Sequence, residues 1–372
     1  MQGTTELQPP QPSPAMVGGA SVARLLIALL AMAGVLAVLW LGWLFLSDNS
    51  ADKLTIAVVA IIWGVGGVAA LFTAANMIVE ALSNKWRGRI QPYVFVGPAV
   101  LLLTLYLLIP SLLTFYQSLF DARSVNFVGV ENYVGVFTDR QMLTAFRNNL
   151  IWLVIGTAGC VVFGLLIAVL ADRSRFETVA KALIFLPMVI SFVGAGVIWR
   201  FIYAYAPPSE PQIGLLNAIL TSFGGSPQTF IQTNQPWNNL FLVVVLIWMQ
   251  TGFAMVIFSA ALKGVPGELL EAARLDGANE VQAFFRVIIP YIWGTVITVT
   301  TTVAIFTLKI FDVVMAMTGG QYGTEVVATQ FYRQFFSSRN FGYGSAIAIV
   351  LFIAVMPVMI YNLRQLRKQE GF

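Results

Sequence analysis

The residues best suited to chemistry gather in one charged stretch, Lys263–Pro290, which reads KGVPGELLEAARLDGANEVQAFFRVIIP. It separates two long apolar runs in a protein whose charged residues make up only 10% of the chain. Its acidic and basic side chains nearly balance, and the protein has no histidine to supply a metal ligand or a general base. Its acidic residues suit a protein partner better than an anionic lipid surface. We call this stretch the charged loop.

The first half of the charged loop predicts a short helix that ends in a bend. Pro266 fits the first helical position, and Glu268 and Glu271 then favour the positive end of the helix dipole. Gly277 is placed to end the helix in a left-handed conformation that glycine adopts without strain. The expected apolar side of this helix consists of Leu269, Leu270, Ala273 and Leu275.

The second half predicts another short helix. Asn279, followed three residues later by Gln282, has the spacing of a capping box, which would start a helix over about Glu280–Ile288. Pro290 then marks entry into the next apolar run. The charged loop is therefore expected to form two short helices with a glycine bend, lying against the membrane surface. Shape alone leaves a second interpretation open, an amphipathic hairpin that only joins two spans.

Composition places these helices in an all-α, polytopic membrane protein. The 372 residues are 58% hydrophobic and include 28 Phe and 9 Trp, which is more apolar surface than a soluble domain can bury. The net charge of +4 is too small to indicate nucleic-acid binding. The single cysteine, Cys160, lies in an apolar run and is expected to be a packing residue, so we expect no metal or redox site.

Eight apolar runs have about the length that an α-helix needs to cross the hydrocarbon of a membrane. They are Ser21–Leu46, Leu54–Leu82, Tyr93–Leu119, Leu150–Ala171, Ala182–Tyr205, Leu240–Leu262, Tyr291–Phe311 and Ser345–Leu363. Residues 1–20, rich in Pro, Gln, Ser, Gly and Thr, are expected to form a disordered tail, and residues 368–372 a second tail. With the N-terminus inside, 13 of the 21 basic residues fall on the cytoplasmic side, so both termini and the charged loop are predicted to be cytoplasmic.

The charged loop resembles the EAA motif of ATP-binding-cassette importer permeases. The match is Glu271-Ala272-Ala273, three residues, Gly277, nine residues, and Val287-x-Ile289-Pro290, with Val287 and Ile289 replacing the commoner Ile and Leu. The string EAARLDGA, preceded by VPGEL, is similar to the carbohydrate branch of that family. The resemblance implies that the loop couples to an ATPase through Glu271, Ala272, Ala273, Asp276, Gly277 and Pro290.

Two other segments carry the same resemblance. NFVGVENYVGVFTD, within Asp121–Arg147, is similar to the FxGxxNY element of sugar-importer permeases. Within Phe311–Tyr343, a Thr-Gly-Gly stretch precedes Thr-Glu and an expected outer helix at Val326–Phe336, and these details are similar to α-glucoside permeases. The resemblance covers residues 92–367 and implies a six-helix core preceded by two extra spans in residues 21–91. This arrangement resembles the larger permease subunit of maltose-type importers, although the large periplasmic insert is absent.

The resemblance also implies partners. The chain has no G-x-x-x-x-G-K-S/T loop, so ATP and Mg would bind a separate ATPase dimer and this chain would carry no cofactor. One permease supplies one docking loop for two ATPase clefts, so a second, similar permease subunit is expected. An extracytoplasmic sugar-binding protein would deliver substrate, and ATPase closure would drive alternating access in the cytoplasmic membrane of a prokaryote. No nucleic-acid partner is expected, and membrane lipid surrounds the spans.

The spans that flank the charged loop contain the candidates for substrate binding. The resemblance implies a sugar pocket there, because an uncharged sugar needs amides and hydroxyls for its rim and aromatic faces for its C–H surfaces. The candidates are Gln250, Phe253, Val303, Phe306 and Thr307. The simpler alternative is that the threonines bond their own helix and the aromatic residues pack. Lys309 and Asp312, three residues apart, are expected to form a mutual pair or an anchor near the outer helix end.

Other function classes have less support. An ion-coupled secondary transporter would need carboxylates within the spans, but Glu80, Asp121 and Asp312 all lie near span ends. A membrane-embedded enzyme would need paired carboxylates, histidine or a cysteine cluster at membrane depth. The same importer class could instead carry another solute, such as a polyol or glycerol phosphate. The sequence therefore predicts a sugar-importer permease subunit rather than an enzyme.

Overall fold

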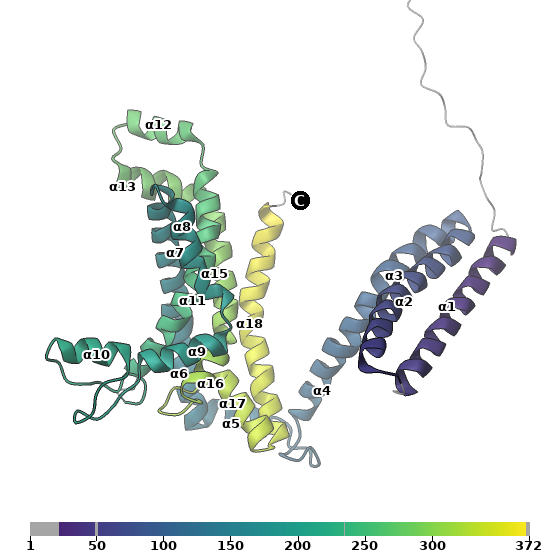
Figure 1. The fold of residues 1–372 in the computed structure, drawn as a ribbon, viewed down its shortest axis with the longest axis horizontal. Coiled ribbons are helices and arrows are strands. Elements are labelled where there is room, and N and C mark those ends of the chain that lie inside the picture. Colours follow the sequence, from purple (N-terminus) through teal and green to yellow (C-terminus); the bar gives the residue numbers. More distant parts are fainter. Residues whose placement is uncertain (1–21, 49–50, 234, 370–372) are drawn as a thin grey trace, which may run out of the picture. The chain divides into compact units, whose positions relative to one another are not determined.

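The fold is all-helical, as the sequence predicts. A computed structural model describes residues 22–48, 51–233 and 235–369, and these ranges contain no β-strand (Figure 1). The expected tail of residues 1–20 and most of the expected C-terminal tail lie outside the described residues. The described chain forms two compact units that divide between Ser111 and Leu112, and each unit is described by itself.

The first unit is built from long apolar helices. They are α1 (Val22–Asp48), α2 (Lys53–Ala81), α3 (Asn84–Leu103), a π-helical turn at Thr104–Leu108 and the start of α4 (Ile109–Gln117). The Asp52 side chain caps α2 by accepting a bond from the Thr55 backbone N–H. The Trp63 indole donates to the Leu39 carbonyl at 3.2 Å, which fastens α2 to α1. The spans are otherwise exposed, which suits contact with lipid.

One expected loop is helical. Residues 83–92 separate two of the expected spans, but the basic segment Lys85–Arg89 forms the first turns of α3, and one continuous helix runs over Lys85–Gln117. The chain turns at Leu82 and Ser83, both in extended conformation, before the helix begins. Lys and Arg are good helix formers, so the basic residues extend the span beyond its apolar part.

The second unit contains the remaining helices. In chain order they are α5 (Glu131–Thr138), α6 (Arg140–Ile151), α7 (Thr157–Asp172), α8 (Glu177–Phe185), α9 (Phe192–Ile202), α10 (Leu215–Ser222), α11 (Trp237–Lys263), α12 (Gly267–Leu275), α13 (Glu280–Ala283), α14 (Ile289–Tyr291), α15 (Trp293–Leu308), α16 (Asp312–Met317), α17 (Val327–Tyr332) and α18 (Phe341–Gln369). Shorter π-helical or 3₁₀ segments join them at Trp152–Gly156, Leu186–Val189, Phe284–Ile288 and Arg333–Ser337.

One of the eight predicted spans contains a sharp bend, and another begins at one. Six helices of the described chain are long and apolar enough to cross a membrane, and two further pairs qualify only together. Glu177–Val189 meets Phe192–Ile202 at 101°, where Ile190 is extended and Ser191 caps the next helix. Glu280–Tyr291 meets Trp293–Leu308 at 71°, at Ile292. Apolar composition predicts a span in both places, but it carries no information about a change of direction at one or two residues.

Helix α11 lies at the centre of the second unit, with many buried side chains along its length. Two neighbouring helices approach it closely at glycines. A Cβ on Gly164 of α7 would lie 2.4 Å from the Ala254 Cβ of α11. A Cβ on Gly252 of α11 would lie 2.6 Å from the Ile184 carbonyl oxygen of α8. Helices in a membrane gain little hydrophobic attraction from each other, so close packing at small residues supplies much of their association. Cys160 is buried in the same interface, as the sequence predicts.

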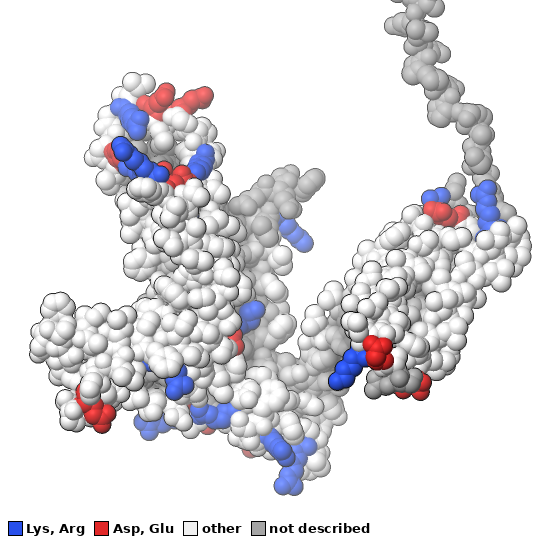
Figure 2. Space-filling view, viewed as in Figure 1, with Lys and Arg blue, Asp and Glu red and all other residues white. Residues whose placement is uncertain are grey.

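Charge is sorted along the helices of each unit. Figure 2 shows charged side chains at the ends of the helices and a broad uncharged band between them. In the second unit, α12 lies at one end and α5, α9, α10, α16 and α17 lie at the other (Figure 1). We call these the loop end and the far end. An uncharged band between two charged ends fits a protein that spans a bilayer.

The α8–α11 contact gives a first prediction. Gly252→Leu should lower the thermal stability of the purified protein, because the added side chain overlaps the Ile184 backbone and overpacking of this kind costs about 1–3 kcal/mol. The measurement is the midpoint of thermal unfolding in detergent. Gly97→Leu is the matched control, because a Cβ at Gly97 meets no atom within 4 Å. Equal midpoints for both variants would contradict the packing argument.

Candidate functional site

The charged loop has the predicted helix–bend–helix form and projects from the loop end (Figure 1). Gly277 has a φ of +80°, the left-handed conformation expected for it. The Asn279 side chain accepts from the Gln282 N–H at 2.9 Å, and the Gln282 side chain accepts from the Asn279 N–H at 3.0 Å. The predicted capping box is therefore present. Pro266 is one residue earlier than expected, because it caps α12 instead of opening it.

Helix α12 offers most of its surface to solvent. Glu271, Ala272 and Asp276 are exposed, whereas Ala273 is buried. Leu275 was expected on the apolar side but is 88% exposed, so the apolar side is narrower than the sequence suggested. No described ion pair involves Glu268 or Glu271. The helix thus presents carboxylates without a described ion pair beside an exposed leucine, and a surface of this kind can bind a protein partner.

The second helix of the charged loop is longer than predicted. It runs through α13, the π-helical segment Phe284–Ile288 and α14, and it ends at Tyr291 instead of Ile288. Pro290 lies within this helix near its C-terminal end, and the bend comes at Ile292. The Tyr291 hydroxyl donates to the Gly264 carbonyl at 3.4 Å, so the two ends of the loop touch.

The five candidate substrate residues have different surroundings. Val303 and Thr307 are fully buried, and the Thr307 hydroxyl donates to the Val303 carbonyl of its own helix. Phe253 packs on a buried cluster, whereas Phe306 is 49% exposed. Gln250 is only 6% exposed, yet its amide forms no hydrogen bond with any described residue. A carboxamide that has no partner among the described residues is available to bond a ligand, which makes Gln250 the strongest of the five candidates.

The threonines of α15 mostly follow the simpler alternative. Their hydroxyls donate to carbonyls four residues back: Thr298 to Gly294, Thr300 to Val296, Thr301 to Ile297, Thr302 to Thr298 and Thr307 to Val303. Thr301 also accepts from the Asn362 amide at 2.6 Å, which fastens α18 to α15. The hydrogen-bonding capacity of these hydroxyls is therefore met within their own helix, as expected in an apolar surrounding.

The FxGxxNY element holds the end of the third span. The Asn132 amide donates to the carbonyls of Ser118 and Phe120, at 2.9 and 2.7 Å. These carbonyls belong to the residues just after α4, which have no helical partners. The nearby Asp121 carboxyl accepts bonds from the Val125 backbone and the Asn126 amide, which lower its pKa.

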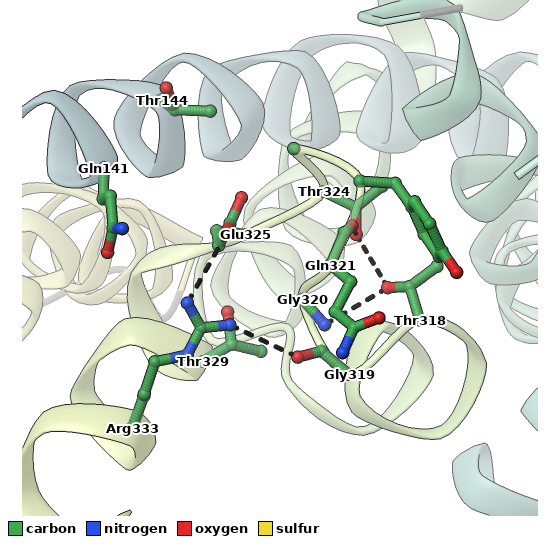
Figure 3. A network of polar contacts seen from close by, with 12 residues as sticks. Gln141, Thr144, Thr318, Gly319, Gly320, Gln321, Thr324, Glu325, Thr329 and Arg333 are labelled. Atoms are coloured by element: carbon green, nitrogen blue, oxygen red, sulfur yellow. Dashed lines mark hydrogen bonds and ion pairs between the residues drawn. The ribbon is translucent and has the colours of Figure 1, made fainter. Parts of the chain in front are cut away.

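A polar turn, residues 318–325, connects α16 to α17 at the far end and is held by hydrogen bonds and an ion pair. Figure 3 shows Thr318 and Thr324 joined through their hydroxyls at 2.7 Å and the Gly320 N–H donating to Thr318. Arg333 of the segment after α17 lies 3.6 Å from Glu325 and also donates to the Gly319 carbonyl. The predicted outer helix is present, as α17 and the following turn. We call residues 318–325 the far-end turn.

Buried asparagines of α6 and α11 donate hydrogen bonds to the backbone of the far-end turn. Asn148 of α6 donates to the carbonyls of Gly323 and Glu325, at 2.8 and 2.7 Å, and accepts from Asn239 of α11 at 3.3 Å. Asn238 donates to the Tyr322 carbonyl at 2.9 Å. Tyr322 has a φ of +59°, which is unfavourable for a residue with a side chain. These bonds stabilise a turn that its own backbone disfavours.

A cavity of about 450 Å³ lies beside the far-end turn. Its walls include Arg200, Tyr203, Tyr205, Phe230, Gln232 and Gln321. The wall combines aromatic faces, two carboxamides, the Arg200 guanidinium and apolar side chains, and no carboxylate lines it. Such a wall can stack on C–H surfaces and bond hydroxyls, and the volume lies within the range of small-molecule sites.

The expected pair of Lys309 and Asp312 is absent. Both side chains are exposed, and no ion pair joins them among the described residues. The prediction assumed one helix, but α15 ends at Leu308 and α16 begins at Asp312. Because the helix is broken between them, the two side chains do not share a helical face.

Comparison with known proteins assigns the chain to a family. Residues 160–368, more than half of the protein, match the model of the binding-protein-dependent transport system inner membrane component. The chain is a member of this family. It is 54% identical over 276 residues to the osmoprotective compounds uptake permease protein of Synechocystis sp., covering 74% of this chain and 99% of that one. It is 45% identical over 334 residues to the α-glucoside transport system permease protein of Rhizobium meliloti, covering 86% and 99%.

A solved structure supports the fold. A chain of the bacterial ABC transporter involved in the import of the acidic polysaccharide alginate superimposes with a TM-score of 0.65. The match covers 77% of this chain and 99% of the other, at 19% sequence identity. The predictions of an all-α permease subunit, a multi-pass inner-membrane location and a non-enzymatic role are therefore confirmed. The family assignment excludes the ion-coupled transporter that the sequence left as an alternative.

Several polar residues of the permease were not singled out from its sequence. The asparagine pairs Asn148-Asn149 and Asn238-Asn239 are buried, and Asn149 also bonds the Leu308 carbonyl and the Val327 N–H. The available signal was two adjacent asparagines beside an apolar run, twice in one chain. Their partners are carbonyls far away in sequence, so spacing alone gave no reason to connect them.

The asparagines give a second prediction. Asn148→Ala should loosen the far-end turn, because the carbonyls of Gly323 and Glu325 lose their donor, at a cost of about 1–3 kcal/mol. The measurement is amide hydrogen exchange of residues 319–327, which should become faster. Gln141→Ala is the matched control, since Gln141 lies on the same helix with an exposed side chain. Unchanged exchange in Asn148→Ala would contradict the role of this residue.

Proposed function

We propose that the permease takes up neutral sugars of the α-glucoside type and docks a separate ATPase on its charged loop. The observation that carries the docking part is the exposed α12, with carboxylates that form no described ion pair and a left-handed bend at Gly277. Glu271 would make a charge-assisted contact, and Ala272 and Ala273 would allow close approach. Asp276 and Gly277 would shape the bend, and Pro290 would lie where the loop re-enters the membrane.

The proposed partners follow from this role. A dimeric ATPase would bind ATP and Mg, and its closure would move the charged loop together with the spans on either side of it. A second permease subunit would supply the other docking loop. An extracytoplasmic binding protein would deliver the sugar at the far end. Both termini and the loop end would then face the cytoplasm, in agreement with the distribution of basic residues.

The domain roles are part of the same proposal. Residues 92–367 would form the six-helix transport core, and residues 21–91 would add two spans outside it. The two extra spans would correspond to α1 and α2, which pack on each other and leave most of their surface for lipid. Residues 1–20 and 368–372 would be cytoplasmic tails.

The proposed substrate follows from the polar groups at membrane depth and at the far end. Gln250 would bond a sugar hydroxyl, and Phe253 and Phe306 would contact its C–H faces, with Val303 and Thr307 shaping the wall. The far-end cavity, whose lining includes tyrosines, carboxamides and Arg200 but no carboxylate, would be the first contact from outside. The relative at 45% identity is an α-glucoside permease, which supports a neutral sugar over a polyol or glycerol phosphate.

Docking on the charged loop gives a third prediction. Glu271→Lys and Gly277→Arg should each abolish uptake of radiolabelled trehalose, sucrose and maltose while the protein stays in the membrane. The first reverses the charge of the contact, and the second places a side chain where φ is +80°. A tagged chain should co-purify an ATPase, and either substitution should abolish this.

The control for charge reversal is Glu210→Lys, an exposed carboxylate in the loop between α9 and α10. Deletion of residues 265–289 should remove the ATPase completely. Normal uptake by both Glu271→Lys and Gly277→Arg would rule out docking at this loop. An active chain that never binds an ATPase would rule out the coupling proposal as a whole.

The unpaired amide gives a fourth prediction. Gln250→Ala should raise the KM for sugar uptake about ten-fold, since a lost hydrogen bond to a substrate hydroxyl is worth roughly 1–1.5 kcal/mol. Co-purification of the ATPase should not change. Thr302→Val is the matched control, because that hydroxyl bonds its own helix. An unchanged KM in Gln250→Ala would remove this residue from the binding site.

A further inference from the structure

Two points of the charged loop, its first residue and the start of its second helix, contact the short connection between α7 and α8. Lys263, the last residue of α11, forms an ion pair with Glu177 at the start of α8. Glu280, the first residue of α13, pairs at 2.9 Å with Arg173, which directly follows α7. These two contacts, on either side of α12, therefore meet the same five-residue stretch, 173–177. Figure 2 shows charged side chains of both signs gathered at this end of the second unit.

A cluster of half-buried polar side chains lies next to this connection. Lys181 of α8 contacts Asp172 of α7, Glu177 of its own helix and the Ser259 hydroxyl of α11. Ser259, only 4% exposed, also donates to Asp172 at 2.7 Å. We call these residues, together with Lys263, the Lys181 cluster. Two lysines face two carboxylates, so the cluster is neutral as a whole and joins three helices at one point.

The cluster is more than a surface ion pair. The side chains of Lys181 and Asp172 are 18% and 16% exposed, so each charge has lost much of its contact with water and gains more from its partner than an exposed charge would. Exposed pairs contribute little to stability, and Arg173–Glu280, with side chains 67% and 64% exposed, is of that kind. The Arg173–Glu280 pair therefore contributes little to stability, but it joins the charged loop to the residue after α7. The Lys181 cluster holds α7, α8 and α11 together.

Close packing next to the Lys181 cluster joins α7, α8 and α11 so that they should move together. Gly164 of α7 and Gly252 of α11 bring the backbones too close for relative sliding without a clash. The α8 helix then leads into the 101° bend that turns the chain into α9. A displacement of the loop at Lys263 and Glu280 would thus reach α8, and through it the bent span.

We propose that the Lys181 cluster and the Arg173–Glu280 pair form the linkage that passes movement of the charged loop to α7 and α8. Lys181, Arg173 and Glu280 are positioning residues: they touch neither sugar nor ATP. The linkage rests on the proposed function, because it requires an ATPase that moves the loop. The linkage specifies how movement of the loop reaches the membrane helices. Helix α8 should move when the loop moves, although α8 is far from the loop in sequence.

The test measures movement of α8 directly. A cysteine is placed at Val179, which is 58% exposed on α8, in a Cys160→Ser background. The assembled transporter, purified through a tag on this chain, is treated with a maleimide reagent without nucleotide and after trapping with ATP and vanadate. With the linkage intact, trapping should change the labelling rate at least about three-fold, as expected for an element that exchanges between two states.

Two variants break the linkage in different ways. Arg173→Glu should abolish the nucleotide-dependent change, and the charge swap Arg173→Glu with Glu280→Arg should restore it. Lys181→Met combined with Asp172→Asn removes one charge of each sign and leaves Glu177 paired with Lys263, so it should fold while losing the change. Arg175→Glu is the control, because Arg175 is exposed in the same connection and belongs to no described ion pair.

The outcomes separate the linkage from the proposed function. Absence of an ATPase from the wild-type preparation would contradict the function itself. A wild-type α8 that labels equally in both states, or an Arg173→Glu variant that still responds, would overturn the linkage alone. Loss of the ATPase in Arg173→Glu would also overturn it, since the pair would then belong to the docking surface. Hydrolysis without uptake of trehalose, sucrose or maltose in the two broken variants would add support.

Discussion

The close approach of α7 and α8 to α11 is the contact on which the second unit depends. Inside a membrane, helices are not driven together by exclusion of water, so association relies on backbone approach and polar contacts. Gly164 and Gly252 provide that approach at two depths, and the Lys181 cluster closes the same three helices at the loop end. Because the charged loop leaves the bundle from α11, its position is set by this packing.

The two ends of the second unit are held by different chemistry. At the loop end, ion pairs between exposed or half-buried side chains join segments near water. At the far end, carboxamides from α6 and α11 bond carbonyls of a turn whose backbone is otherwise unfavourable. Ion pairs tolerate small shifts in geometry, whereas hydrogen bonds from buried amides do not. The loop end is therefore suited to transmit movement, and the far end to keep the shape of a binding surface.

The distribution of polar groups at membrane depth is consistent with transport of a neutral solute. The threonines of α15 bond their own helix, and the asparagines bond backbone carbonyls. Gln250 differs from them, because it is buried without a partner among the described residues.

The sequence alone determined the fold class, the approximate spans, the bend at Gly277 and the capping box at Asn279. These features depend on apolar run length or on interactions within a few residues, so local pattern is enough. The tertiary structure decided what the sequence left open: the bends at Ile190 and Ile292, the separation of Lys309 from Asp312, and the partners of Lys181 and Asn148. Each of these depends on residues far apart in the chain, and residue type and local spacing do not encode which of the many possible distant partners is met.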